Sequence, residues 1–112
     1  MQCPNWLDVN RVQVFLNGRP DAKLNFTRRT TPDRFQNDVV KFEAHLPLKL
    51  EGDTHVIVAT TQEEGLVGRV MGSQWGSLPP AAVSNPIFVD VDGGGFKANG
   101  DLLDVPLPIL PK

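Results

Sequence analysis

The sequence has few of the residues on which enzymes and disulfide-bonded domains depend. Among 112 residues there is one cysteine, Cys3, there are two histidines, His45 and His55, and there is no tyrosine. A single cysteine excludes an internal disulfide and a zinc site built on a cysteine pair. Two histidines are too few for a multinuclear metal site, and no serine lies in a nucleophile-elbow context. These absences indicate a chain that is not an enzyme, with two ordinary histidines.

Long apolar runs and basic clusters are also missing. The formal net charge is −2, and the basic residues are scattered apart from the pair Arg28-Arg29. A nucleic-acid partner would call for a basic face, and a membrane partner for an apolar span or a polybasic stretch. The sequence therefore predicts neither partner, and the arginine pair is interpreted as a solvated strand end.

Short strands joined by turns account best for what is present. Glycine and proline number 10 each, 40% of the residues are hydrophobic, and no segment has a long run of apolar residues at helical spacing. The length suits one domain of residues 1–112. Alternation of apolar and polar side chains predicts an all-β fold. The expected strands are 11–16, 24–27, 39–50, 54–61 and 87–91.

Three connections carry further expectations. Asn17-Gly18 followed by Arg19-Pro20-Asp21 predicts a hairpin loop longer than two residues. Residues 62–80 predict a long connection with a short strand at 66–70. The proline-rich residues 102–112 are expected to run extended along the surface.

The acidic turn DVDGGGFKANGD, residues 90–101, partly matches a calcium-binding loop. Asp90, Asp92, Asn99 and Asp101 could supply oxygen ligands. Position 5 of the loop is a glycine, position 12 is Asp where Glu is usual, and no helix flanks the loop. A glycine-rich turn with solvated carboxylates is therefore favoured over a calcium site.

The two tryptophans offer a second candidate for ligand binding. Trp75 lies in the loop MGSQWG and could stack on a sugar ring. The favoured interpretation is that Trp6 and Trp75 are apolar anchors buried in the core of a small domain.

Two stretches resemble known bacterial proteins. RVQVFLNGRP, residues 11–20, resembles the strand-turn signature of bacterial immunoglobulin-like accessory domains. SNPIFVDVDGGGFKANGD, residues 84–101, resembles the C-terminal end of PHP-superfamily metallohydrolases of the CehA/McbA type, and PLKLEGDTHVIV, residues 47–58, fits the same module. The resemblance runs from about residue 6 to 107 and covers only the accessory part of such an enzyme. None of the family's metal-ligand cluster is carried over, and its acidic residue in the DVDG-x-G turn is Gly94 here.

The resulting expectation is an immunoglobulin-like β-sandwich that lacks its first strand or strands and forms the C-terminal piece of a larger protein. Its function would be that of a non-catalytic accessory domain of a bacterial metal-dependent hydrolase. Its expected partners are the catalytic domain of its own chain or, through an open sheet edge, another copy. The alternative is a calcium- or carbohydrate-binding module. An enzyme using His45 or His55 ranks last.

Overall fold

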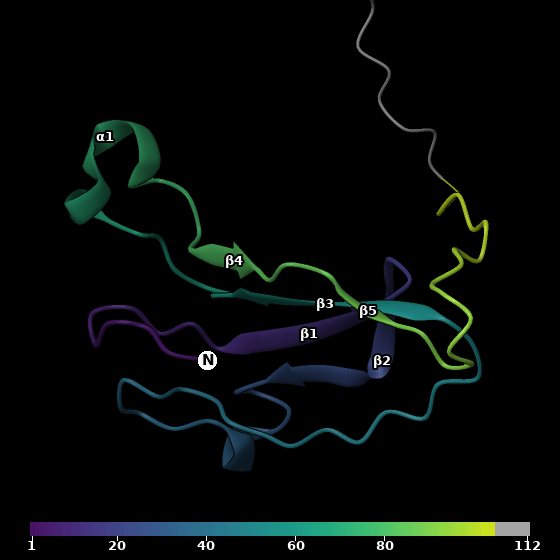
Figure 1. Cartoon of the computed structure of the whole chain (residues 1–112). Coiled ribbons are helices and arrows are strands. Elements are labelled where there is room, and N and C mark those ends of the chain that lie inside the picture. Colours follow the sequence, from purple (N-terminus) through teal and green to yellow (C-terminus); the bar gives the residue numbers. More distant parts are fainter. Residues whose placement is uncertain (105–112) are drawn as a thin grey trace, which may run out of the picture.

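An antiparallel β-sheet organises the protein. The computed structural model describes residues 1–104 of the chain. Within these residues five strands form one sheet in the order β2-β1-β3-β4, with β5 also paired to β3 (Figure 1). The strands are β1 (Arg11–Leu16), β2 (Arg19–Thr27), β3 (Thr54–Thr61), β4 (Ala81–Val83) and β5 (Ile87–Val89). The short helices are η1 (Pro32–Arg34), η2 (Arg69–Met71) and α1 (Gly72–Trp75). The expectation of an all-β protein is confirmed.

The β1–β2 hairpin is tighter than predicted. Its turn consists only of Asn17 and Gly18, with φ of 51° and 81°, and Leu16 pairs with Arg19. The expected longer loop is therefore wrong, because residues 19–21 already belong to β2. Pro20 is tolerated there because β2 is an edge strand and the missing N–H need not join a ladder. The register between the two strands shifts between Gln13 and Phe15. Gln13 pairs with Asn25 and Phe15 with Pro20, so β2 has more residues than β1 over this stretch.

Strand β3 is the centre of the sheet, as its β-branched sequence predicts. It pairs with β1 along one edge, and β4 and β5 share its other edge at opposite ends. Strand β4 was not predicted because three residues are too few to show a period. The predicted short strand at 66–70 is wrong, since residues 66–68 form no regular element and η2 begins at Arg69. The expected last strand 87–91 is shorter, ending at Val89.

The predicted strand 39–50 is not formed. Only Val40 and Phe42 make isolated backbone pairings, with Gln2 and Phe35 respectively. The alternation nevertheless describes the side chains of residues 42–46 correctly: Phe42 is buried and Ala44 is half-buried, whereas Glu43 and His45 are exposed. The expected inward position of Leu48 is wrong, because this residue is exposed. Lys41 is the exception on the polar side, because its side chain is buried. The segment is extended with one apolar side, but along most of its length it has no partner strand among residues 1–104.

The core joins the sheet to this extended segment. Val12 of β1 and Phe26 of β2 pack against Phe35 and Phe42 from the connection between β2 and β3. The ring centroids of Phe26 and Phe42 are 5.5 Å apart, and those of Phe35 and Phe42 are 5.2 Å apart. This connection therefore forms a second layer over one face of the sheet. The extended tail predicted for 102–112 lies outside the described residues from 105 onward.

Candidate functional site

Three carboxylates converge at the end of the sheet where β3 begins and β5 ends. Asp53 immediately precedes β3, while Asp90 and Asp92 follow β5. Because Thr54 pairs with Val89 across antiparallel strands, the residues just outside the pair are brought together. One oxygen of each carboxylate lies within 4.8 Å of the others. This is the only group of three or more Asp, Glu, His or Cys ligands within residues 1–104.

Backbone amides already occupy part of this acidic cluster, defined as Asp53, Asp90 and Asp92. Asp53 accepts hydrogen bonds from the N–H groups of Val91 at 2.9 Å and Lys97 at 2.8 Å. Asp92 accepts one from Gly94 at 2.9 Å. The cluster therefore folds the glycine-rich turn back onto the start of β3.

Asp90 makes the tightest connection to that turn. Its two oxygens accept from Gly93 at 2.8 Å and Gly95 at 2.7 Å. These bonds, with that from Gly95 contributing most, hold the pKa of the Asp90 carboxyl below its ordinary value, because they stabilise the anion. Each carboxylate oxygen keeps a lone pair after accepting one N–H, so the cluster can still take a hard cation.

Only part of the predicted calcium set is brought together. Asp90 and Asp92 are in the acidic cluster, and Asn99 lines the same shallow cavity as Asp53 and Asp92. Asp101 instead binds Arg19 through two hydrogen bonds. Sequence reasoning missed Asp53, whose position depends on the pairing of β3 with β5 and has no local signal.

An apolar groove of about 560 Å³ runs between the sheet and the extended segment of the second layer. Val12 and Val14 of β1 and Val58 of β3 form its floor. Three other segments of the chain form its walls. These walls include Met1, Gln2, Phe42, Glu43, Ala44, Leu46, Ala82, Val83 and Ser84. Within residues 1–104, the backbone groups of residues 43–49 make no hydrogen bond to other protein groups. We call this stretch the open edge.

The histidines lie on separate elements. His45 is exposed on the open edge, whereas His55 is half-buried in β3 with its ring 6.1 Å from that of Phe88. Neither belongs to the acidic cluster. The arrangement provides no paired histidines among the described residues.

The tryptophans are not core anchors. Trp6 and Trp75 are each 54% exposed, so the interpretation that they fill the core is wrong. The physical reason is that η2 and α1 form a small excursion away from the sheet, where Trp75 has no core to enter (Figure 1). Trp75 therefore presents part of its ring to solvent, where a ligand could stack on it.

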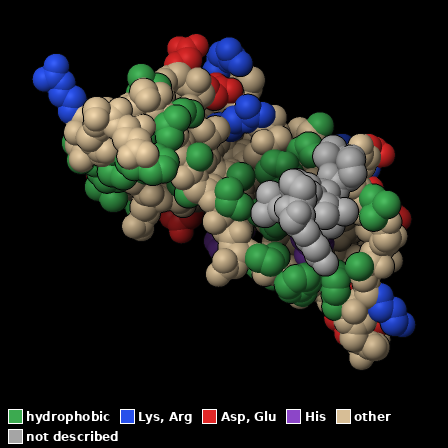
Figure 2. All heavy atoms as spheres, turned by 90° about the horizontal axis from the view of Figure 1, so that it is seen from above, with side chains coloured by type: hydrophobic (Ala, Val, Ile, Leu, Met, Phe, Trp, Pro, Cys, Tyr) green, Lys and Arg blue, Asp and Glu red, His purple; other side chains and the backbone are tan. Residues whose placement is uncertain are grey.

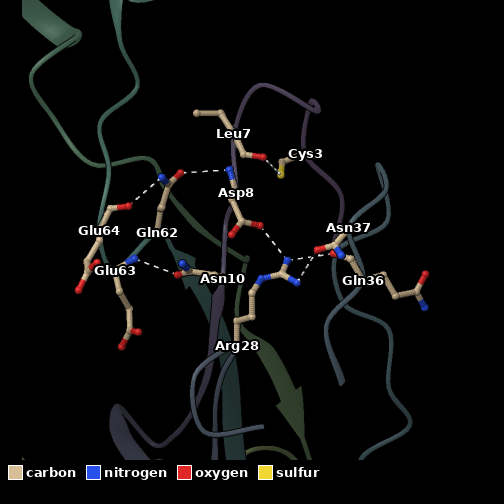
Figure 3. A network of polar contacts seen from close by, with 10 residues as sticks. All are labelled: Cys3, Leu7, Asp8, Asn10, Arg28, Gln36, Asn37, Gln62, Glu63 and Glu64. Carbon is tan, nitrogen blue, oxygen red and sulfur yellow. Dashed lines mark hydrogen bonds and ion pairs between the residues drawn. The ribbon is translucent and has the colours of Figure 1, made fainter. Parts of the chain in front are cut away.

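Arg28 has a structural role that the sequence did not reveal. Its guanidinium donates to Asp8 at 2.8 Å, to the carbonyl of Gln36 at 2.9 Å and to Asn37 at 3.0 Å (Figure 3). It also lies 5.5 Å from the ring centre of Phe35. Arg28 thus joins the N-terminal segment to the second layer, while the side chain of its neighbour Arg29 is 77% exposed.

Basic side chains do not gather into a patch on the face of the molecule seen in Figure 2, whereas apolar side chains reach the surface in several places. The exposed apolar residues include Val83, Ile87 and Phe88. No helix within residues 1–104 combines the length and the apolar character that crossing a membrane requires.

Comparison of the chain with protein-family models, with curated proteins and with solved structures finds no match in any of the three.

Proposed function

We propose that this chain is a non-catalytic accessory domain of a larger bacterial metal-dependent hydrolase, and that its complete architecture is an immunoglobulin-like β-sandwich. The resemblance of residues 11–20, 47–58 and 84–101 to such domains of PHP-superfamily enzymes suggests the parent class. The observation that carries the proposal is the apolar groove beside the open edge. The floor of this groove consists of the apolar side chains of Val12, Val14 and Val58. An apolar groove of this type is typical of a surface that packs against another part of a protein.

The exposed apolar side chains support packing against a larger partner. Val83 is 69% exposed and Phe88 is 60% exposed, and both lie on the strands that border β3. Large apolar surface on a small domain marks an interaction site more often than a free surface. In this proposal the partner is the catalytic domain of the same polypeptide, which supplies the metal ligands.

An antibody raised against the purified chain tests this proposal in cells that express the gene. We expect it to detect a polypeptide much larger than 12.3 kDa. The immunoprecipitate should have hydrolase activity that requires divalent metal, and the isolated chain should have none. A single species of 12.3 kDa without activity would contradict the proposal, as would metal-dependent hydrolysis by the isolated chain that His45→Ala or His55→Ala abolishes.

Calcium binding is a second candidate function, favoured by the convergence of Asp53, Asp90 and Asp92. Hard oxygen ligands suit calcium, and a half-open site of this type would bind with a Kd of about 10⁻⁴–10⁻³ M. Calorimetry with calcium should give saturable heat for the wild type and for Asp33→Asn, and none for Asp53→Asn. Absence of heat and of any thermal shift at millimolar calcium would remove this candidate.

A further inference from the structure

The apolar groove and the open edge lie in line with the N-terminal segment. Residues 1–3 run antiparallel to residues 39–42: the N–H of Cys3 donates to Val39 at 3.1 Å, and the N–H of Lys41 donates to Met1 at 3.0 Å. Moving from Cys3 to Met1 therefore means moving from Val39 toward Phe42. A strand that continued this direction beyond Met1 would run beside residues 43–48.

That continuation enters the groove. Met1 and Gln2 form one part of its wall, Ala44 and Leu46 of the open edge form another, and its floor is the apolar face of the sheet. The Met1 nitrogen already donates to the carbonyl of Phe42 at 2.6 Å. A peptide N–H at the same place would make the same bond as part of a ladder. The open edge then supplies further N–H and carbonyl groups for the rest of that ladder.

The side chains that fit there follow from the strand period. Met1 packs against the core cluster, so the residues two, four and six positions before it would point to the same side. Apolar side chains at these positions would fill the groove above Val14 and Val58. The intervening positions would face outward, as Glu43 and His45 do on the neighbouring segment.

We propose that the groove is completed by β-strand addition, and that its occupant is the polypeptide segment directly before Met1 in the larger protein. The occupant pairs antiparallel with residues 43–48 and places alternate apolar side chains on β1 and β3. This inference rests on the proposed function for the existence of the longer polypeptide. It adds the specific element by which that polypeptide and this chain form one core.

Two N-terminal extensions of equal composition test the proposal. The matched extension adds Val-Thr-Val-Thr-Val-Thr before Met1, which puts valine at the second, fourth and sixth preceding positions. The shifted extension adds Thr-Val-Thr-Val-Thr-Val and differs only in parity, which moves every valine to the outer face. We expect the matched extension to raise the Tm by about 5 °C or more. It should also slow amide exchange in residues 43–48 at least tenfold, and the shifted extension should do neither.

A groove variant makes the test specific. Ala82 is exposed on the groove wall. In Ala82→Asp the carboxylate would have to be buried beside an added strand, so this variant should abolish the gain from the matched extension. It should leave the Tm of the unextended chain nearly unchanged, because Ala82 is exposed and no strand within residues 1–104 covers it.

Three results would overturn the proposal. One is equal behaviour of the two extensions. Another is strong protection of residues 43–48 in the unextended chain that disappears when residues 105–112 are deleted, which would make the C-terminal segment the occupant. The third is the same protection disappearing on dilution, with a dimer in sizing experiments, which would make a second copy the occupant. The size of the natural polypeptide is measured separately, so failure of this inference and failure of the proposed function give different results.

Discussion

Arg19 and Asp101 are 82 residues apart in the chain, yet the guanidinium donates hydrogen bonds of 2.5 and 2.9 Å to the two oxygens of the carboxylate. A further bond of 2.9 Å joins Arg19 to Asp104. Arg19 directly follows the hairpin turn, so this contact ties the segment after β5 to the β1–β2 hairpin. The Arg19 hydrogen bonds, helped by the N–H of Leu103, lower the pKa of Asp101 from its ordinary 3.8 to about 2.

The Arg19–Asp101 contact predicts a defined pH dependence. Because the pKa is depressed in the folded state, the contact stabilises the fold above about pH 4, and this contribution is lost as the pH falls toward 2. Carboxyl-carbon NMR should show Asp101 titrating near pH 2. Between pH 4 and 2, the wild type should lose more stability than Asp101→Asn. Asp33→Asn, which changes an exposed carboxylate outside this contact, should retain the wild-type pH dependence.

The hairpin turn predicts a sharp difference between two glycines. Gly18 has φ of 81°, and a Cβ there would lie 2.7 Å from a methyl carbon of Leu103. Gly18→Ala should lower the free energy of unfolding by about 1–2 kcal/mol, because alanine is strained in this conformation. At Gly52 φ is not positive and a Cβ would meet nothing within 4 Å, so Gly52→Ala should cost less than about 0.5 kcal/mol. Urea denaturation of both variants measures the difference, and equal values would contradict the turn geometry.

The aromatic cluster predicts the cost of removing one ring. Phe42 packs against the rings of both Phe26 and Phe35. Phe42→Leu removes two aromatic pairs, each worth about 0.5–1.5 kcal/mol, so the free energy of unfolding should fall by about 1–3 kcal/mol. The matched control is Val39→Ala, whose side chain is 44% exposed and whose cost should stay within about 0.5 kcal/mol. A neutral Phe42→Leu would mean that the second layer does not pack on the sheet in solution.

The adjacent arginines should respond differently to lysine. Arg28→Lys replaces a planar fork with three partners by a single ammonium, and should destabilise the protein by about 1–2 kcal/mol. Faster amide exchange is expected at Cys3, whose N–H donates to Val39 in the second layer. Arg29→Lys keeps a charge that lies 4.0 Å from Glu63 on a largely exposed side chain, so it should change the free energy of unfolding by less than about 0.5 kcal/mol. The same loss in both variants would contradict the role given to the three hydrogen bonds of the Arg28 guanidinium.

The sequence alone identifies only part of the acidic cluster. The turn beginning at Asp90 was recognisable because carboxylates and glycines are close in sequence. Asp53 was not, because its only connection to that turn is through the pairing of β5 with the start of β3. Asp101 shows the converse. Its position in the sequence fits that of a calcium ligand, but in the structure it pairs with Arg19 and lies outside the acidic cluster.

The sequence by itself determined the β character of the chain, the turn at Asn17-Gly18, the central strand and the inward side of residues 42–46, because these depend on alternation and on local backbone preference. Only the tertiary structure decided which extended segments become strands, since a ladder needs a partner on the neighbouring segment. It also decided that Asp53 lies beside Asp90 and Asp92, that Asp101 binds Arg19, and that Trp75 is exposed. These depend on contacts between residues far apart in the chain, and side-chain periodicity carries no information about them.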